Sequence, residues 1–301
     1  MTSFWKSLFS KQPQPNAKAD KDIVVQFDDP WREIKWDSKT EIVEEVKELA
    51  LSNPDIKHLR FLMTGPVGAG KSSFVNSVNS VFQNRITNKA IMATSTEISC
   101  TEIYKGYKIK NGESGTLSFM FFDMMGVEKG SKKGVDVHDL NNALLGHLPD
   151  GYKFNQHSCM STDDTGYISK PSLDGKTHCL VCAVDGNTIS QLDAEIVDKI
   201  KQSFKAAAKL GISQVIVMTK IDEICPLVKE KLRNVYKSKK IKEKMEECSN
   251  RLQIPMTCIF PVKNYHEEIE TNDDTDILLL LALKQIAHFA NDYVEDLEQQ
   301  E

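Results

Sequence analysis

The sequence predicts a three-layer α/β domain, in which helices flank a mostly parallel sheet. Strand-like and helix-like segments alternate from residue 58 onward, and a glycine-rich loop joins the first strand to the first helix. Such alternation is typical of a parallel sheet with helices on both faces. The 301 residues, 40% hydrophobic and 27% charged, are enough for one large domain with a sizeable core.

The predicted elements follow one another without an internal repeat. An amphipathic helix over 39–53 is expected to pack its apolar face on the domain, with Trp31 and Trp36 as anchors. Strands are expected at 58–63, 101–109, 116–123, 178–185, 213–219 and 256–262. Helices are expected at 71–83, 136–145, 192–210, 227–251 and 275–297. The second and third strands are joined by a turn that contains Asn-Gly, which is typical of a hairpin.

The chain divides into an N-terminal extension over 1–57 and the α/β domain over 58–298. The polar residues 10–22 are expected to form a flexible tether. Residues 1–10, ahead of it, carry apolar residues at helical spacing. They could anchor the chain to a membrane or a partner, but a frayed or locally packed end is favoured, because so short a helix is marginal in water. Residues 146–177 lack a clear period and are either an insertion or a long loop.

Composition excludes several classes of protein. With a net charge of -5 and a pI near 5.9, no global basic field attracts nucleic acid, which is therefore not expected as a partner. The longest apolar stretch, 277–283, is far too short to span a bilayer, and the N-terminus lacks the features of a secretory signal. Seven cysteines, an odd number, do not indicate a disulfide framework, so a cytoplasmic location is expected.

A phosphate-binding loop is the strongest motif. Residues 65–72 match G-x-x-x-x-G-K-[ST] in full, between a strand and a helix, which is the context the motif requires. Its glycines let backbone N–H groups surround a β-phosphate, Lys71 reaches the β- and γ-phosphates, and the Ser72 hydroxyl is a candidate Mg²⁺ ligand. The fold class therefore becomes the P-loop NTPase fold. The predicted phosphate-binding residues are Gly65, Pro66, Val67, Gly68, Ala69, Gly70, Lys71, Ser72 and Ser73.

Two later motifs indicate whether the nucleotide is GTP or ATP. Asp123 ends an apolar strand and Gly126 follows three residues on; the Asp belongs near the Mg²⁺ shell in GTPases and ATPases alike, whereas the Gly favours GTP. The stretch 219–222, Thr-Lys-Ile-Asp, fits [NT]-K-x-D at a strand end. Asp222 would accept hydrogen bonds from guanine that adenine cannot supply.

The remaining base contacts are assigned on weaker patterns. Thr219 is expected to brace the phosphate loop, and the aliphatic stem of Lys220 to cross the base. The loop after the next strand carries Val262, Lys263 and Asn264 in place of the usual Ser-Ala-Lys. Lys263 is assigned to the base from its position alone. GTP or GDP with Mg²⁺ is thus the predicted ligand of a Ras-like G domain.

A hydroxyl from 85–101 is expected to complete the Mg²⁺ shell and to sense the γ-phosphate. Thr94, Ser95, Thr96 and Thr101 all qualify, and Thr96 is the first choice by spacing. Lys71 and Thr96 are accordingly the predicted catalytic residues, and Ser72, Asp123 and Thr96 the predicted metal ligands.

Two observations limit the chemistry. Val127 stands where many small GTPases place a water-orienting Gln, so hydrolysis is expected to be slow unless another group substitutes. The alternative is a nucleotide-stabilised scaffold with negligible hydrolysis that acts through protein binding. Cys179 and Cys182 form a C-x-x-C with His157 and Cys159 upstream, but buried free cysteines are favoured over zinc because strand positions three apart face opposite sides.

The chain resembles the interferon-induced protein 44 family of GTP-binding proteins over roughly 27–298. Besides the phosphate loop, the segments that carry the resemblance are PWREIKW, the strand with DMMG, YKFNQ, SKPSLDGKTHCLVCAVDG and FANDYVEDL. The resemblance implies a Ras-like core, guanine-nucleotide binding, a cytoplasmic location and a role in innate antiviral responses. An unidentified protein effector and a homodimer are the protein partners expected; longer family members have an extra N-terminal domain, for which the N-terminal extension over 1–57 is expected to leave no room.

Overall fold

Six strands form one sheet in the order β2-β3-β1-β4-β5-β6. The computed structural model describes residues 26–90, 102–112, 115–130, 134–155 and 158–298. All neighbouring strands are parallel except β2 and β3, which form the predicted antiparallel hairpin. The strands are β1 Leu59–Thr64, β2 Lys105–Lys110, β3 Thr116–Asp123, β4 Cys179–Asp185, β5 Ser213–Thr219 and β6 Ile259–Pro261.

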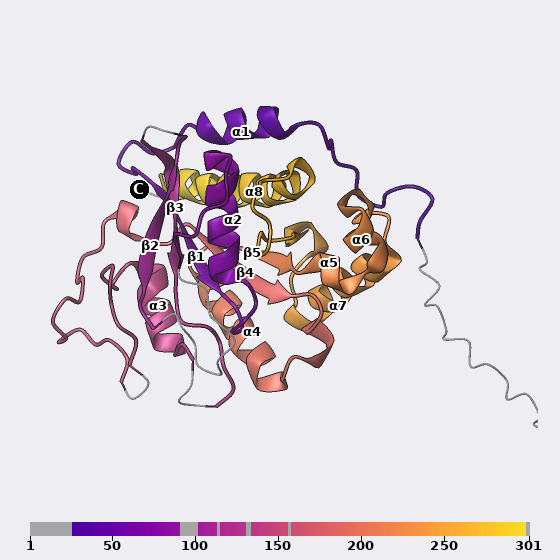
Figure 1. Ribbon diagram of the computed structural model, residues 1–301. Coiled ribbons are helices and arrows are strands. Elements are labelled where there is room, and N and C mark those ends of the chain that lie inside the picture. The colour runs from indigo at the N-terminus through magenta and orange to yellow at the C-terminus, as the bar shows by residue number, and fades with distance from the viewer. Residues whose placement is uncertain (1–25, 91–101, 113–114, 131–133, 156–157, 299–301) are drawn as a thin grey trace, which may run out of the picture.

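Helices cover both faces of this sheet, which gives the predicted three layers (Figure 1). α1, α2 and α8 enclose one hydrophobic core, and α3, α4 and α7 enclose the other. The helices are α1 Lys39–Lys47, α2 Lys71–Gln83, α3 Val137–Leu145, α4 Ala194–Lys209, α5 Ile221–Ile224, α6 Pro226–Glu230, α7 Lys239–Leu252 and α8 Asp273–Glu298. The fold class is therefore the α/β fold of P-loop proteins.

The central strand β4 shows how the sheet separates the two cores. All seven of its residues are buried, and alternate side chains enter opposite cores. Cys179 lies in the core under α2 and α8, whereas Cys182 lies in the core under α3, α4 and α7. Burial raises the pKa of both thiols. The two sulfurs cannot share one zinc ion, because the sheet lies between them.

Four predicted elements differ from the structure by more than two residues at an end. The strand expected at 101–109 begins at Lys105, in β2. The helix expected at 227–251 is wrong as one unit: it is divided into α6 and α7 by a short 3-10 turn, Leu232–Asn234, and by residues up to Ser238. The Ser238 hydroxyl accepts a hydrogen bond from the Ile241 amide at 3.2 Å and so begins α7 as an N-cap. The helix expected at 39–53 ends at Lys47, and the strand expected at 256–262 is shortened to β6. The described residues of 146–177 form a long loop, in which the one helical element is the 3-10 turn Leu173–Gly175.

Residues 26–47 run across the β6 edge of the sheet and then onto α8; we call this segment the strap. The amides of Phe27 and Trp31 donate to the carbonyls of Lys237 and Tyr236. Arg32 donates to the carbonyls of Ile259 and Met256 at 3.0 and 2.9 Å. The strap thus packs on the domain, while the predicted boundary between 57 and 58 stays a prediction. The anchor predicted at 1–10 lies outside the described residues.

No helix in the described part of the chain combines the length and apolar composition of a membrane span.

Candidate functional site

The motif residues meet at the carboxyl edge of the sheet. β1, β3, β4, β5 and β6 point the same way, so the loops that follow them lie at one edge. The β1 loop leads into α2, and the β3 strand ends in Asp123. Ligands of open α/β sheets bind at this edge.

The phosphate loop, 65–70, has a backbone that requires glycine at its first position. Gly65 has φ +124°, and a Cβ there would lie 2.1 Å from the Ala183 carbonyl oxygen of β4. Behind the loop, α2 begins at Lys71 with no side chain capping its first amides. An uncapped helix N-terminus presents N–H groups and partial positive charge, which is the usual setting for a bound anion.

Lys71 is held within the loop that precedes it. Its side chain is buried, and its ammonium donates to the carbonyls of Gly65 and Pro66 at 3.1 Å each. Burial lowers the pKa of this ammonium, and the nearby Asp123 carboxylate acts in the opposite direction. A buried, desolvated cation next to uncapped amides favours a ligand with negative charge.

Asp123 and Ser72 bring two oxygens together beside Lys71. The Ser72 hydroxyl donates to Asp123 Oδ2 at 2.7 Å, and Asp123 is 1% exposed. The other carboxylate oxygen, Oδ1, is buried without a hydrogen-bond partner among the described residues. Burial raises the pKa of the carboxyl, against the effect of Lys71. Hard oxygen ligands with an unmet acceptor fit Mg²⁺, which also takes ligands from phosphates and water.

The segment after Asp123 docks on the phosphate loop. The Val127 amide donates to the Gly65 carbonyl at 3.0 Å, and Val127 pairs with Pro66 in a short parallel bridge. A Cβ at Gly126 would lie 2.7 Å from Val67 Cγ2 and 3.0 Å from Lys71 Nζ. Only glycine therefore lets the backbone approach Lys71 this closely.

The residues after β5 contact both the phosphate loop and β4. Thr219 donates from its hydroxyl to the Ala69 carbonyl at 2.8 Å. Lys220 adopts a left-handed backbone, φ 57°, and its ammonium lies 2.8 Å from Asp185 Oδ2. Asp222, half-buried in α5, has neither hydrogen-bond nor ion-pair partner within the described part of the chain. Its carboxylate is available to a ligand.

The loop after β6 meets the site through a residue with only a weak assignment from the sequence. Asn264 Nδ2 donates to the Gly70 carbonyl at 3.2 Å. The Lys263 ammonium instead lies 2.6 Å from Glu268 Oε1. The structure brings Asn264 to the phosphate loop, and the assignment of Lys263 to the base stays a prediction.

Two site residues were missed by the sequence reasoning. Asp185, which holds Lys220, ends a buried strand as Asp123 does, and that shared position is the signal that could have found it. Glu268, which holds Lys263, gives no motif signal. The metal-shell candidates Thr94, Ser95, Thr96 and Thr101 lie outside the described residues, so the role of Thr96 is untested.

Comparison with known proteins finds homologues of this chain. No protein-family model matches it. Human interferon-induced protein 44-like is 34% identical over 247 residues, which cover 82% of this chain and 54% of the relative. Mouse interferon-induced protein 44 is 34% identical over 243 residues, 80% of this chain and 57% of the relative. The chain is a homologue of the interferon-induced protein 44 family. The resemblance inferred from the motifs is confirmed, and the chain spans about half the length of the curated relatives it matches.

Solved structures of GTP-binding proteins are more distant. Toc33 from Arabidopsis thaliana, in complex with Mg²⁺ and GMPPNP, is 14% identical with a TM-score of 0.43 and covers 85% of this chain and 91% of its own. A GTP-binding protein from Sulfolobus solfataricus, in complex with GDP, is 14% identical with a TM-score of 0.37 and covers 76% of this chain and 52% of its own. At these scores, the fold assignment for the interferon-induced 44 homologue rests on its own strand order and loop geometry.

Proposed function

We propose that this chain binds guanine nucleotide with Mg²⁺ and acts as a slow GTPase switch. The observation that carries the proposal is the pair of oxygens on Ser72 and Asp123, 2.7 Å apart, beside the buried ammonium of Lys71. A site that binds phosphate with Mg²⁺ requires the hydroxyl, the carboxylate and the lysine together. A glycine-rich turn that contains a lysine by chance does not require the other two groups.

Each residue of the site has a distinct role in this proposal. The amides of 65–73 bind the β-phosphate, and Lys71 neutralises charge between the β- and γ-phosphates. Ser72 and Asp123 hold Mg²⁺, which supplies charge stabilisation to the phosphates when bound. Gly126 is proposed to donate its amide to the γ-phosphate, and the close approach of its backbone to Lys71 Nζ supports this role.

Base selection belongs to the loops after β5 and β6. Asp222 accepts from the N1–H and 2-amino groups of guanine, and Thr219 keeps the phosphate loop in register with it. The ion pair with Asp185 fixes the end of Lys220, so its aliphatic stem crosses the base in a defined direction.

Hydrolysis is slow in this proposal, because nothing at position 127 can orient water. Val127 is 2% exposed, and its amide is already bonded to the phosphate loop. Lys71 and Thr96 remain the residues proposed to act on the γ-phosphate. The second candidate function follows from the same valine: a nucleotide-stabilised scaffold whose output is protein binding.

Calorimetry with GDP and ADP tests the proposal. We expect GDP to bind about 100-fold or more tightly than ADP, because a site built for guanine leaves a polar group unpaired against adenine. Equal affinity for the two would contradict guanine binding. Single-turnover hydrolysis then separates the switch from the scaffold: a slow rate that Lys71→Ala abolishes supports the switch, and a rate unaffected by Lys71→Ala supports the scaffold.

The names of the relatives suggest a cellular role, which we add to the proposal. Induction by interferon, a part in innate antiviral defence, a cytoplasmic location and a protein effector belong to it, with a second copy of the chain as the alternative partner. Capture of partners by GMPPNP-loaded and GDP-loaded protein tests the effector. Lys71→Ala is the matched control, and capture that does not depend on the nucleotide favours the scaffold.

A further inference from the structure

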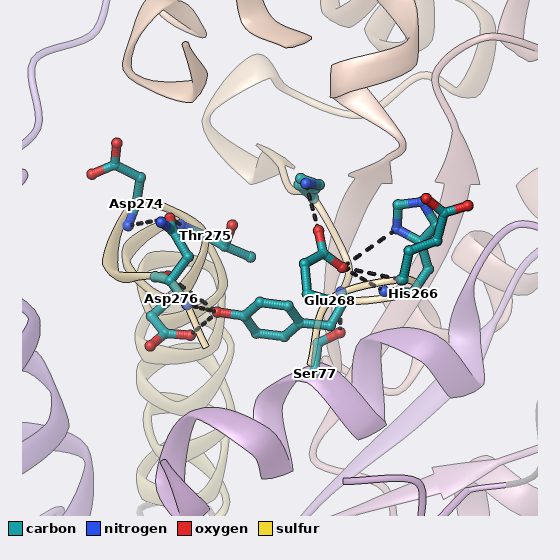
Figure 2. Close-up of polar contacts among 10 residues, drawn as sticks. Ser77, His266, Glu268, Asp274, Thr275 and Asp276 are labelled. Atoms are coloured by element: carbon teal, nitrogen blue, oxygen red, sulfur yellow. Dashed lines mark hydrogen bonds and ion pairs between the residues drawn. The ribbon is translucent and has the colours of Figure 1, made fainter. Parts of the chain in front are cut away.

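The loop between β6 and α8, residues 262–272, connects the candidate site to elements far from it. At its start, Asn264 donates to the carbonyl of Gly70, the last residue before α2. The next amide, that of Tyr265, donates to the Ser77 hydroxyl of α2 at 2.9 Å. Figure 2 shows Ser77 of α2 below the start of this loop and Asp276 of α8 to its left. The loop is therefore fixed from both sides.

The hydroxyl of Tyr265 links the loop to α8. It donates to Asp276 Oδ1 at 2.6 Å and accepts from the Asn272 amide at 2.7 Å. Asn272 in turn caps α8, because its Oδ1 accepts from the amides of Asp274 and Thr275 (Figure 2). The tyrosine thus ties the two ends of the loop to one buried carboxylate.

That carboxylate depends on the strap. Asp276 is 0% exposed, and its Oδ2 lies 2.7 Å from the ammonium of Lys39, the first residue of α1. No other cation pairs with Asp276 in the described part of the chain. Removing one member of a buried ion pair leaves an uncompensated charge, which is strongly destabilising locally.

A continuous path therefore runs from the strap to the phosphate loop. It passes from Lys39 to Asp276, from Asp276 to Tyr265, and through the backbone to Asn264 and Gly70. The strap that carries Lys39 is itself held at the sheet edge by Arg32. Every contact on the path is polar, and its central members are buried, so displacing one end changes the hydrogen bonds available to the next.

We propose that docking of the strap and binding of nucleotide are coupled, with Lys39 as the positioning residue that holds the β6–α8 loop against the phosphate loop. This inference rests on the proposed function for the identity of its ligand. Because coupling is reciprocal, nucleotide stabilises the docked strap, and release of the strap weakens nucleotide binding. A partner that lifts 26–47 would act as a nucleotide-release factor.

The test compares two lysines on the same pair of helices. Lys39→Met removes the ion pair with the buried Asp276 and, with it, the pair that Lys39 makes with the exposed Asp273. Lys284→Met removes the pair that Lys284 makes with Glu45 at 2.7 Å, which also joins α8 to α1 but does not touch the loop. Calorimetry with GDP is expected to show a loss of about fivefold or more for Lys39→Met and wild-type affinity for Lys284→Met. Lys39→Arg is expected to restore binding.

A second readout needs no nucleotide. Hydrogen exchange of the ligand-free protein is expected to be faster at the amides of 262–272 in Lys39→Met than in wild type or Lys284→Met. Tyr265→Phe removes one hydroxyl, keeps the ring packed, and should loosen the same amides if Lys39→Met fails to fold. Faster exchange supports the hold of Lys39 on the loop even if wild type proves not to bind GDP, a result that would contradict the proposed ligand. Unchanged exchange with wild-type GDP affinity in both variants overturns the inference.

Discussion

The two sides of the candidate site are built in different ways. On the phosphate side, 65–73 and 123–127, motif residues contact one another: Lys71 donates to Gly65 and Pro66, and Ser72 to Asp123. On the base side, 219–222 and 262–272, the two lysines are instead held by carboxylates that belong to no nucleotide-binding motif. Asp185 holds Lys220, and Glu268 holds Lys263.

The two kinds of recognition therefore depend on different parts of the chain. Phosphate binding uses backbone amides, so it needs glycines at fixed spacing and is local in sequence. Base binding uses side-chain functional groups, whose directions depend on partners supplied by the fold. Lys220 and Asp185 are 35 residues apart and become neighbours only because β4 and β5 pair in parallel. Substitutions that alter the backbone should therefore damage the phosphate side most, and substitutions that alter side-chain groups should damage the base side most.

The phosphate side should be most sensitive to a change in its backbone. Gly65→Ala places a Cβ 2.1 Å from the Ala183 carbonyl, in a backbone with φ +124°. We expect a loss of about 3 kcal/mol or more in the free energy of unfolding, from backbone strain and overpacking together. Urea unfolding followed by circular dichroism measures it.

Gly68→Ala is the matched control for that variant. Gly68 also has a positive φ, +76°, but a Cβ there meets nothing within 4 Å. It should cost only about 1 kcal/mol, from the left-handed backbone alone. Equal costs at the two positions would show that the approach of the loop to β4 is not what constrains this side.

The next effect changes the base side without disturbing the fold. Asp222→Asn is expected to weaken GDP about 10- to 100-fold, because a hydrogen bond to a charged group is lost, and to shift preference towards xanthine diphosphate. Stability should be unchanged, since Asp222 has no partner in the described chain. Glu223→Gln, an exposed neighbour with the same change of charge, serves as control. A GDP affinity that survives Asp222→Asn would remove this residue from the base side.

Much of the fold could be predicted from the sequence because its boundaries are local. The limits of α2, β3 and β5 agree with the prediction to the residue. α2 begins after Gly70, and β3 begins after Gly115 and ends at Asp123. The break between α6 and α7 could not be predicted. Its sequence is charged and helix-favouring, and the break depends on Val235 and Tyr236 being buried and on the strap bonding to the Tyr236 carbonyl.

The candidate site divides in the same way. The positions of Gly65, Lys71 and Asp123 could be predicted from motif spacing, because the backbone geometry of the phosphate loop itself requires that spacing. The contact of Asn264 with Gly70 joins residues 194 positions apart, and no local pattern indicates it. Side-chain partners of this kind depend on the assembled sheet, which single-sequence patterns do not describe.

A smaller effect tests the one residue that belongs to both sides. Thr219 lies in the base motif, yet its hydroxyl donates to the Ala69 carbonyl of the phosphate loop. Thr219→Val keeps the shape and leaves that carbonyl without its donor, which costs about 1 kcal/mol and lowers the melting temperature by about 2 °C. GDP affinity should fall about fivefold if the brace supports phosphate binding. Thr188→Val, at an exposed position, is the control; a lower melting temperature with unchanged affinity would make the brace purely structural.

The smallest effect concerns Glu268, whose carboxylate pairs with the ammonium of Lys263 and fixes its orientation. Burial works against ionisation of Glu268, but hydrogen bonds from Lys263 and from the His266 amide outweigh it and lower its pKa from 4.5 to about 2. A carboxyl whose pKa is lowered by folding adds stability above pH 4.5, and this stability is lost as the pH falls towards 2. Glu268→Gln should therefore be less stable than wild type at pH 7, by under about 1 kcal/mol for a partly exposed ion pair.

The gap between wild type and Glu268→Gln should narrow as the pH falls from about 4.5, as the wild-type carboxylate becomes protonated. Urea unfolding midpoints of the two proteins, measured at about pH 7, 5 and 3.5, follow that change. Glu267→Gln, at the exposed neighbouring position, should show no such narrowing. A gap that stays constant with pH would mean that shape, and not charge, joins Glu268 to the loop. The base side would then resemble the phosphate side in depending on backbone geometry.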